Sequence, residues 1–478
     1  MKKYLFYVLL ATLSIFTACK KEYALPDVTS PSNVIVEVRK EVNLSFSFNA
    51  EGGYASSTIS ASNGTATIQS DGVTGSVSGN IIVTFSASTQ IGAGSVIINI
   101  TDEKGQMGTA TAVLDVVGVP TISITNNIAE DTTWETGNVY ILEGRITVLS
   151  GSTLTIEPGV IIKGREGSSS NATALMIARG GKLMAEGTAT SPIIFTSVAD
   201  QILPGEIASP NLEPILNGLW GGLLILGNAP ISAATSPKQI EGIPPSDQNG
   251  LYGGDVPTDN SGTIKYISIR HGGANIGEGN EINGLTLGGV GSGTTIENIE
   301  IVANQDDGIE WFGGLVNLKN VILWNVGDDA VDTDQSWGGT IDNFVVINPF
   351  DECFELDGPE GVMIATHTIK NGTVKAHDAE GLADLDDNTP VNMSNIYFFD
   401  IKAGQDFDDM PVPASGGLLT ASGLQVTLPA GTVITDFFKE GTDAYVTAVA
   451  AGANTVGADV SVFQTWSWAA VAGELAGM

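Results

Sequence analysis

The sequence predicts an all-β protein in two parts, a small antiparallel sandwich followed by a solenoid of parallel strands. The solenoid is predicted by a repeat in which a short apolar strand accompanies a group of carboxylates. Its copies are QDDGIEW (305–311), GDDAVDTD (327–334), FDECFELD (350–357) and HDAEGLADLDD (377–387). The first three are offset by 22 and 23 residues, and one copy is too small to bury its own apolar residues. The copies must therefore stack as coils and share a continuous core.

The N-terminal residues predict a secretion signal that ends in a lipid attachment site. Two lysines precede an apolar stretch from Tyr4 to Phe16, and small residues then lead to Cys19. This ending resembles the lipobox of bacterial lipoproteins. The resemblance implies that residues 1–18 are a signal peptide and that Cys19 is acylated as a membrane anchor, with the polar stretch 19–30 as a tether. The alternative is an ordinary secretory signal with an incidental cysteine.

Residues 31–118 predict the antiparallel sandwich. Short segments in which apolar and polar residues alternate, such as LSFSF, GSVIINI and TATAVLDVV, are separated by turns rich in glycine, asparagine and aspartate. The segment 99–116 resembles the last hairpin of bacterial immunoglobulin-like modules. The resemblance implies a spacer, and no functional site is expected there.

Residues 119–411 are predicted to form the solenoid. Segment 134–164, in which Ile, Leu and Val strands alternate with glycine-rich bends, resembles the opening coils of the right-handed parallel β-helix of the pectin-lyase-like superfamily. The segments WGGLLILGNAPI, IRHGG and NQDDGIEWFGG are similar to those of uncharacterised, secreted bacterial lipoproteins. Resemblances of pattern imply the fold and leave the function open. Residues 412–478 are expected to cap the open end of the solenoid.

Stacking of the coils predicts ladders of equivalent acidic residues, because neighbouring strands lie about 4.8 Å apart. The expected ladders are Asp306, Asp328 and Asp351; Asp307, Asp329 and Glu352; and Glu310, Asp332 and Glu355. Side chains alternate along a strand, so the apolar neighbours of these carboxylates should point inward. The acidic residues are therefore expected on an outer face.

The acidic coils carry more negative charge than their own basic residues can balance. Residues 297–411 contain 24 Asp and Glu against four lysines, with no arginine. Stacked like charges repel, so the carboxyls must be solvated, hold protons or bind a cation. Calcium fits because it takes about six to eight oxygen ligands in flexible geometry. The predicted ligands are Asp306, Asp307, Asp328, Asp329, Asp351 and Glu352. Solvated charge that maintains solubility is the alternative.

The overall charge limits the kinds of partner. Twenty basic residues against 54 acidic ones give a net charge of −34, which argues against nucleic acid and anionic lipid. After the N-terminus, no segment has the ~18 consecutive apolar residues of a membrane-spanning helix. Together with these observations, the resemblance to the lipobox implies a lipoprotein of the bacterial cell envelope, anchored in the outer membrane and facing the surface or the periplasm. Its expected role is a binding or structural module for a glycan or an envelope protein.

A polysaccharide hydrolase is the alternative function. Polygalacturonases of the superfamily that the chain resembles use aspartates from adjacent coils, and Asp306-Asp307 and Asp328-Asp329 are similar to their Asp-Asp pair. One carboxyl would serve as acid and another as base. Those enzymes also carry Gly-His-Gly and Arg-Ile-Lys segments after the acidic pair, for which Arg270-His271 is a distant substitute. A lyase is less favoured, because its base is typically Lys or Arg and the acidic coils contain no arginine.

Three further features have structural explanations. Trp311 is expected to point into the core, whereas Trp337 could either pack there or stack on a sugar. Cys353 occupies the repeat position of a glycine and an alanine in earlier coils, so a buried, unreactive thiol is expected. An inward ladder of amides bonded from coil to coil is predicted from the recurrence of Asn298, Asn320, Asn343, Asn371 and Asn395.

Overall fold

The protein was analysed as a computed structural model, which describes residues 21–168, 171–274, 282–386, 388–407, 418–439 and 441–478. The chain divides into two compact units, Met1–Val119 and Pro120–Met478. The predicted signal peptide and Cys19 lie outside the described residues. Within the described ranges, no helix is long and apolar enough to cross a membrane.

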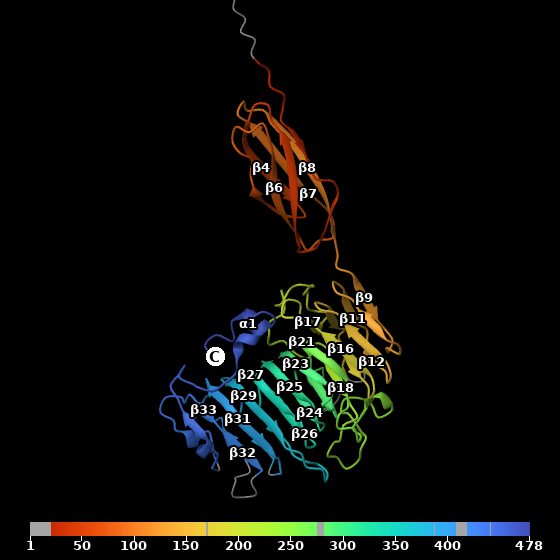
Figure 1. Ribbon diagram of the computed structural model, residues 1–478, viewed down its shortest axis with the longest axis vertical. Helices are drawn as coiled ribbons and strands as arrows, with labels where there is room; N and C mark the ends of the chain where they lie inside the picture. The colour runs from red at the N-terminus through yellow and green to blue at the C-terminus, as the bar shows by residue number, and fades with distance from the viewer. Residues whose placement is uncertain (1–20, 169–170, 275–281, 387, 408–417, 440) are drawn as a thin grey trace, which may run out of the picture. The chain divides into compact units, whose positions relative to one another are not determined.

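The first unit is a β-sandwich of two four-stranded sheets, ordered β1-β3-β6-β5 and β2-β8-β7-β4 (Figure 1). Its strands are β1 (Asp27–Thr29), β2 (Val34–Glu37), β3 (Glu41–Asn49), β4 (Tyr54–Ser62), β5 (Gly64–Ser70), β6 (Ser78–Ala87), β7 (Gly92–Asp102) and β8 (Met107–Val117). The alternation read from the sequence is real, since Leu44, Phe46 and Phe48 of β3 are buried while the residues between them are exposed. The pairings are antiparallel except that of β2 with β8.

The second unit is a right-handed parallel β-helix, so the predicted fold class is confirmed. One wall, the short-strand sheet, consists of β12 (Arg145–Val148), β15 (Ala174–Ile177), β18 (Leu223–Leu226), β22 (Leu285–Gly288), β24 (Ile309–Phe312), β26 (Val331–Asp334), β28 (Glu355–Leu356) and β30 (Asp384–Leu385). Successive members pair in parallel, one coil apart. The core inside the coils is formed by Ile, Leu, Val and aromatic side chains from both walls.

The other wall, the long-strand sheet, has sixteen strands. They are β9 (Thr121–Ile124), β10 (Thr132–Trp134), β11 (Val139–Leu142), β13 (Thr153–Ile156), β14 (Ile161–Gly164), β16 (Lys182–Glu186), β17 (Ile193–Ser197), β21 (Gly262–Arg270), β23 (Thr295–Val302), β25 (Asn317–Trp324), β27 (Thr340–Ile347), β29 (His367–Lys375), β31 (Val391–Phe399), β32 (Leu419–Ser422), β33 (Leu424–Val426) and β34 (Val446–Ala448). Outside the two walls lie the hairpin of β19 (Lys238–Gln239) and β20 (Leu251–Tyr252), helix α1 (Trp468–Ala472) and 3₁₀ turns at Gln248–Gly250, Ile434–Asp436, Thr442–Tyr445 and Val460–Phe463.

In the long-strand sheet, each of the strands β23, β25, β27, β29 and β31 bends at one of the recurring asparagines. All five have positive φ angles, between 56° and 67°. Asparagine is among the few residues with a side chain that tolerate this left-handed conformation. The predicted amide ladder is present, because Asn320 donates to Asn298, Asn343 to Asn320 and Asn395 to Asn371. The ladder is interrupted at Asn371, which donates to Asp342 instead.

The prediction that this ladder faces inward is wrong. Asn343 also exchanges hydrogen bonds with the backbone of Asp459, which belongs to the C-terminal segment outside the coil, and Asn395 is exposed. The amides thus lie on the outside of the bend. The recurrence in the sequence reflects the backbone conformation as much as the hydrogen bonds.

Replacing Asn320 should separate these two effects. We expect Asn320→Leu to lower the free energy of unfolding by about 2–4 kcal/mol, through left-handed strain and two lost hydrogen bonds. Asn320→Gly, which tolerates the positive φ, should lose only the hydrogen bonds. Tryptophan fluorescence during urea unfolding reports on the β-helix alone, since all seven tryptophans follow Pro120. Equal destabilisation by both substitutions would contradict the role of the bend.

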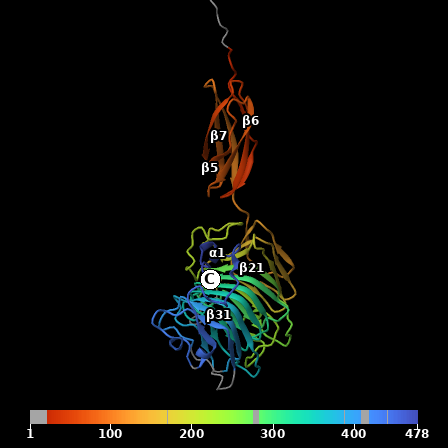
Figure 2. The same cartoon turned by 60° about the vertical axis from the view of Figure 1, so that its left-hand side comes forward.

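The C-terminal residues do more than extend the end of the coil. Strands β32 to β34 continue the long-strand sheet, but residues from Asp459 onward return along its outer surface, where α1 lies beside β21 (Figure 2). Phe463, Trp466 and Trp468 pack there against Trp324 and Val345. The two C-terminal tryptophans therefore cover a flank of the β-helix and do not close its end.

Candidate functional site

The acidic pairs lie in the turns that lead from the long-strand sheet to the short-strand sheet. These turns open with Ala303, Asn325 and Asn348, each with a positive φ. The second acid of one turn then accepts a hydrogen bond from the next coil. Asp307 Oδ1 accepts from the Asp329 amide at 3.1 Å, and Asp329 Oδ1 accepts from the Glu352 amide at 2.7 Å. The predicted stacking of Asp307, Asp329 and Glu352 is therefore present.

The turn column continues upstream through a neutral residue. The amide of Gly284 donates to the Asp307 carbonyl, as the amide of Gly308 does to that of Asp329. Asn283 therefore occupies the position of Asp307 one coil earlier. We call Asn283, Asp307, Asp329 and Glu352 the turn column. It ends downstream at Gly381, where a Cβ would overlap the Glu352 carboxylate.

A second line of acids, the strand column, runs along the outer side of the short-strand sheet. Strand register places Glu310 beside Asp332, Asp332 beside Glu355 and Glu355 beside Asp384. On the opposite side of the same strands, Ile309 and Trp311 belong to the core. The predicted alternation of apolar and acidic residues is thus correct.

The prediction that these acids form an exposed face is wrong for the first coils. Only 6% of Asp307, 6% of Glu310, 5% of Asp329 and 8% of Asp332 is exposed. The insertion between β18 and β21 folds over the first acidic coil, where Ile231, Ile240 and Tyr252 pack with Phe312 of β24. Such an insertion is not part of the repeat, so periodicity could not reveal it.

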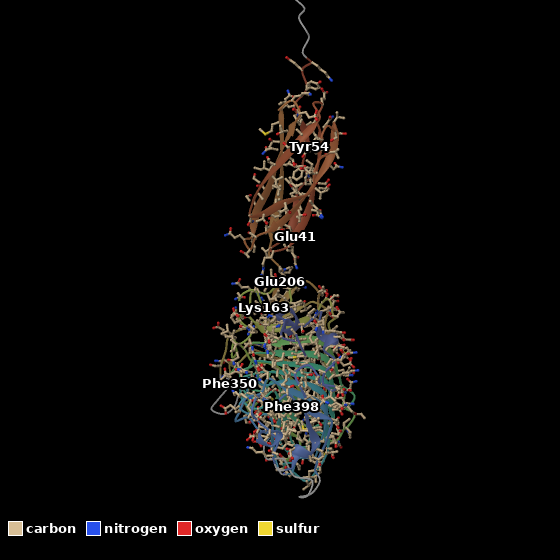
Figure 3. All side chains as sticks on the ribbon, turned by 90° about the vertical axis from the view of Figure 1, so that its left-hand side faces the viewer. Glu41, Tyr54, Lys163, Glu206, Phe350 and Phe398 are labelled. Carbon is tan, nitrogen blue, oxygen red and sulfur yellow. The ribbon has the colours of Figure 1, made fainter. Side chains whose placement is uncertain are left out.

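Exposure increases along the columns. Glu352 and Glu355 are half-buried, and Asp384 is exposed. Beside this end of the columns, Phe350, which precedes Asp351, lies exposed at the margin of the β-helix, whereas Phe398 lies within its body (Figure 3). The turn column and the strand column, together called the acidic site, are therefore covered at their first coil and open at their last, while Asp306 and Asp328 beside them are partly exposed.

The two columns are joined by diagonal hydrogen bonds between successive coils. Asn283 donates through Nδ2 to Glu310 Oε2. In the next two coils the equivalent partners are both acids, since the carboxyl of Asp307 hydrogen-bonds that of Asp332 and the carboxyl of Asp329 hydrogen-bonds that of Glu355. Two carboxyls can share such a bond only if one of them holds a proton.

Burial and mutual repulsion make these carboxyls unusually weak acids. Desolvation, followed by neighbouring carboxylates, raises the pKa of Asp307, Glu310 and Asp332 well above the ordinary range. The same causes raise the pKa of Asp329 to about 10 and that of Glu352 to about 8. On the outer side of the strands, Asp334 and Asp357 have pKa values raised to about 7. Without a cation, several of these groups are therefore protonated near neutral pH.

Two groups of carboxylates have the spacing of a cation site. Asp306, Asp307 and Asp328 form the outer group, and Asp307, Glu310 and Asp332 form the inner group; within each, one oxygen per residue lies within 4.8 Å of the others. Oxygens that each lie about 2.4 Å from a common calcium ion satisfy this limit. The structure thus brings three of the predicted ligands together. Asp329, Asp351 and Glu352 belong to neither group.

On a different face of the same coils, acidic residues are balanced by lysines. Along the outer side of the long-strand sheet, the register places acidic and basic residues in alternation, in the order Glu186, Lys265, Glu297, Lys319, Asp342 and Lys370. Ion pairs of 3.3 Å join Lys265 to Glu297 and Lys370 to Asp342. In the strand column, by contrast, four carboxylates follow one another. The like-charged stacking is therefore particular to the acidic site.

The three tryptophans of the acidic coils, Trp311, Trp324 and Trp337, are buried and offer no platform for a sugar. Trp311, Trp337 and His367 stack inside the coil, with ring centroids 4.6 Å and 5.4 Å apart. Trp324 is covered by Trp468 of the C-terminal segment. Trp311 thus lies in the core as expected, and Trp337 packs there too. Cys353 is also fully buried, as predicted.

Arg270 and His271 are both buried under the C-terminal segment. The Arg270 side chain lies 3.7 Å from Glu300, a residue that the sequence analysis missed. The sequence did contain a signal for Glu300, because this acid stands between Ile299 and Ile301 in an apolar strand. Because both are buried there, neither Arg270 nor His271 can act on a substrate bound at the acidic pairs.

The match to a family model agrees with this architecture. A family model described as a pectate-lyase-like β-helix domain matches residues 126–415. No curated protein matches the sequence. Similar solved structures include the SrpA adhesin from Streptococcus sanguinis, at 16% identity over 23% of this chain and 69% of that chain, with a TM-score of 0.18. They also include a family 28 exopolygalacturonase from Yersinia enterocolitica, at 11% identity over 89% of this chain and 90% of that chain, with a TM-score of 0.20. Since the family model spans more than half of the sequence, the chain belongs to the pectate-lyase-like β-helix family.

Proposed function

We propose that this protein is a lipoprotein of the bacterial outer membrane, anchored through Cys19, whose β-helix is a binding module. Its acidic site holds a divalent cation, most simply calcium, and engages a glycan or an envelope protein at its solvent-exposed side. Support for the anchor comes from the lipobox-like ending of the signal sequence. Incorporation of labelled palmitate into the wild-type chain but not into Cys19→Ala tests it.

The outer group carries the proposal of cation binding. Asp306, Asp307 and Asp328 offer converging oxygens, and the first and last of them are partly exposed to solvent. A cation can therefore enter, and water or a ligand can complete its coordination. Surface charge that served solubility alone would have no reason to converge at one point.

Calcium should raise the melting temperature of the full chain, because a ligand that binds only the folded state stabilises it. At a calcium concentration about 100 times the Kd, the expected gain is about 2.7 kcal/mol. The double variant Asp306→Asn/Asp328→Asn should lose most of this response. Asp378→Asn is the matched control, since it removes an exposed charge from the same region. No response in the wild type, or an unchanged one in the double variant, would refute the outer site.

A glycoside hydrolase is the second candidate, because the site pairs protonated and ionisable carboxyls. The pKa of Asp329 is raised to about 10, so its carboxyl could donate a proton, as a general acid must. The candidate catalytic residues are Asp306, Asp307, Asp328 and Asp329. Incubation with plant, algal and host glycans tests this function. Release of reducing ends that Asp307→Asn or Asp329→Asn abolishes would favour hydrolysis over binding.

A further inference from the structure

The inner group differs from the outer one in its surroundings. Asp307 comes from a turn, Glu310 from β24 and Asp332 from β26, and each is more than nine-tenths buried. Glu310 and Asp332 are not among the ligands expected from the sequence. Three carboxylates in such an enclosed place cannot all be ionised unless positive charge accompanies them.

An unpaired oxygen lies beside this group. Asn283 is 1% exposed, and its Nδ2 donates to Glu310, but its Oδ1 is buried and has no hydrogen-bond partner among the residues that the structure describes. Buried amide oxygens are almost always satisfied, so this one requires an explanation. A hard cation supplies it, because amide oxygens are ordinary ligands of calcium.

The convergence of the three carboxylates indicates where positive charge is needed. One oxygen of each lies within 4.8 Å of the others, and strand register places Glu310 beside Asp332. One cation among them would neutralise all three residues together. The neighbouring Asn304 fixes the turn, since its Nδ2 donates to the Asp307 carbonyl at 2.8 Å.

We propose that Asp307, Glu310 and Asp332, with Oδ1 of Asn283, form a buried second site for a divalent cation, which shares Asp307 with the outer group. The inference deepens the proposed function, because the acidic site then holds two cations bridged by one carboxylate. The inner cation is structural and ties the coils of β22, β24 and β26 together. The outer cation faces the ligand.

Calcium stoichiometry distinguishes the two sites. Titration calorimetry of the chelator-treated full chain should give two calcium ions per wild-type chain and one for Glu310→Gln. The variant Asp306→Asn/Asp328→Asn should also bind one, and Asp378→Asn, the control, two. One ion in the wild type that Glu310→Gln retains would overturn the inner site and leave the proposed function standing. If Asp306→Asn/Asp328→Asn bound as many calcium ions as the wild type, the outer site would be refuted instead.

Hydration of the bound ion provides a readout that does not depend on affinity. Terbium can replace calcium, and its luminescence decay in H₂O and D₂O counts the waters bound to it. The ion retained by Asp306→Asn/Asp328→Asn should carry almost none, because the inner group is enclosed. The ion retained by Glu310→Gln should carry several. Equal hydration in the two variants would overturn the buried site. Circular dichroism and tryptophan fluorescence identify any variant that fails to fold. If Glu310→Gln does not fold, Asp332→Asn tests the inner site in its place.

Discussion

Raising the pH from about 6.5 to about 9 should destabilise the metal-free β-helix. Its folded state holds protons on Asp334, Asp357 and Glu352, whose pKa values are raised to about 7, 7 and 8, and on Asp329, at about 10. The unfolded chain ionises these groups near pH 4. The stability that they contribute is therefore complete below about pH 4 and is lost as the pH rises through the folded-state values. Each retained proton corresponds to about 1.4 kcal/mol per pH unit.

We expect the melting temperature, followed by tryptophan fluorescence, to fall by at least about 5 °C over this interval. His367 cannot cause this fall, because burial lowers its pKa to about 3 while the unfolded chain releases the proton near pH 6.5, so its small contribution raises stability with pH. Saturating calcium should flatten the profile, since a cation replaces the protons. Asp329→Asn/Glu352→Gln should reduce the slope in the absence of calcium. Flat, identical profiles with and without calcium would mean that the acids are ordinary solvated charges.

The replacement of Glu300 by alanine should cost about 3–5 kcal/mol of stability. Glu300 is fully buried and accepts hydrogen bonds from Ser268 Oγ at 2.5 Å and from the Ala469 amide at 2.9 Å. It also compensates Arg270, which is fully buried beneath Trp468. Its loss leaves an uncompensated cation and a vacant acceptor position between the long-strand sheet and α1.

Two further variants identify the cause of this destabilisation. Glu300→Gln keeps the volume and one acceptor, so it should cost less than the alanine variant. Arg270→Met/Glu300→Leu removes both charges and should recover most of the stability, as replacement of a buried ion pair by apolar residues often does. Urea unfolding measures all three. If the double variant were as unstable as Glu300→Ala, packing and not charge would be the cause.

The periodic part of the molecule could be predicted because equal coil lengths fix the register. A step of 22 residues places Asp307 against Asp329 wherever the coil lies, and the alternation around Ile309 and Glu310 follows from strand geometry. The burial of Glu310 and Asp332 could not be predicted in this way. It depends on the insertion before β21, whose contacts with the acidic coil have no sequence period.

The role of the C-terminal segment was similarly hidden. Trp466 and Trp468 indicated that this segment packs against the rest of the chain. The sequence does not indicate which surface of the β-helix it covers. The structure places it over Glu300 and Arg270, so an acid that looked like surface charge is part of a covered ion pair. Asn283 was missed because it stands before the first acidic copy, where the repeat is not yet recognisable.

The alternating charges on the long-strand sheet have a consequence for the way the β-helix meets other surfaces. Because Lys265, Lys319 and Lys370 interrupt the acids there, that face is nearly neutral, and the negative charge of these coils is concentrated on the opposite wall. The coils are therefore electrically polarised across their width. Near a polyanionic cell surface, such a body should orient its neutral face toward the polyanion and its acidic wall away from it, and this preference should weaken as salt is added.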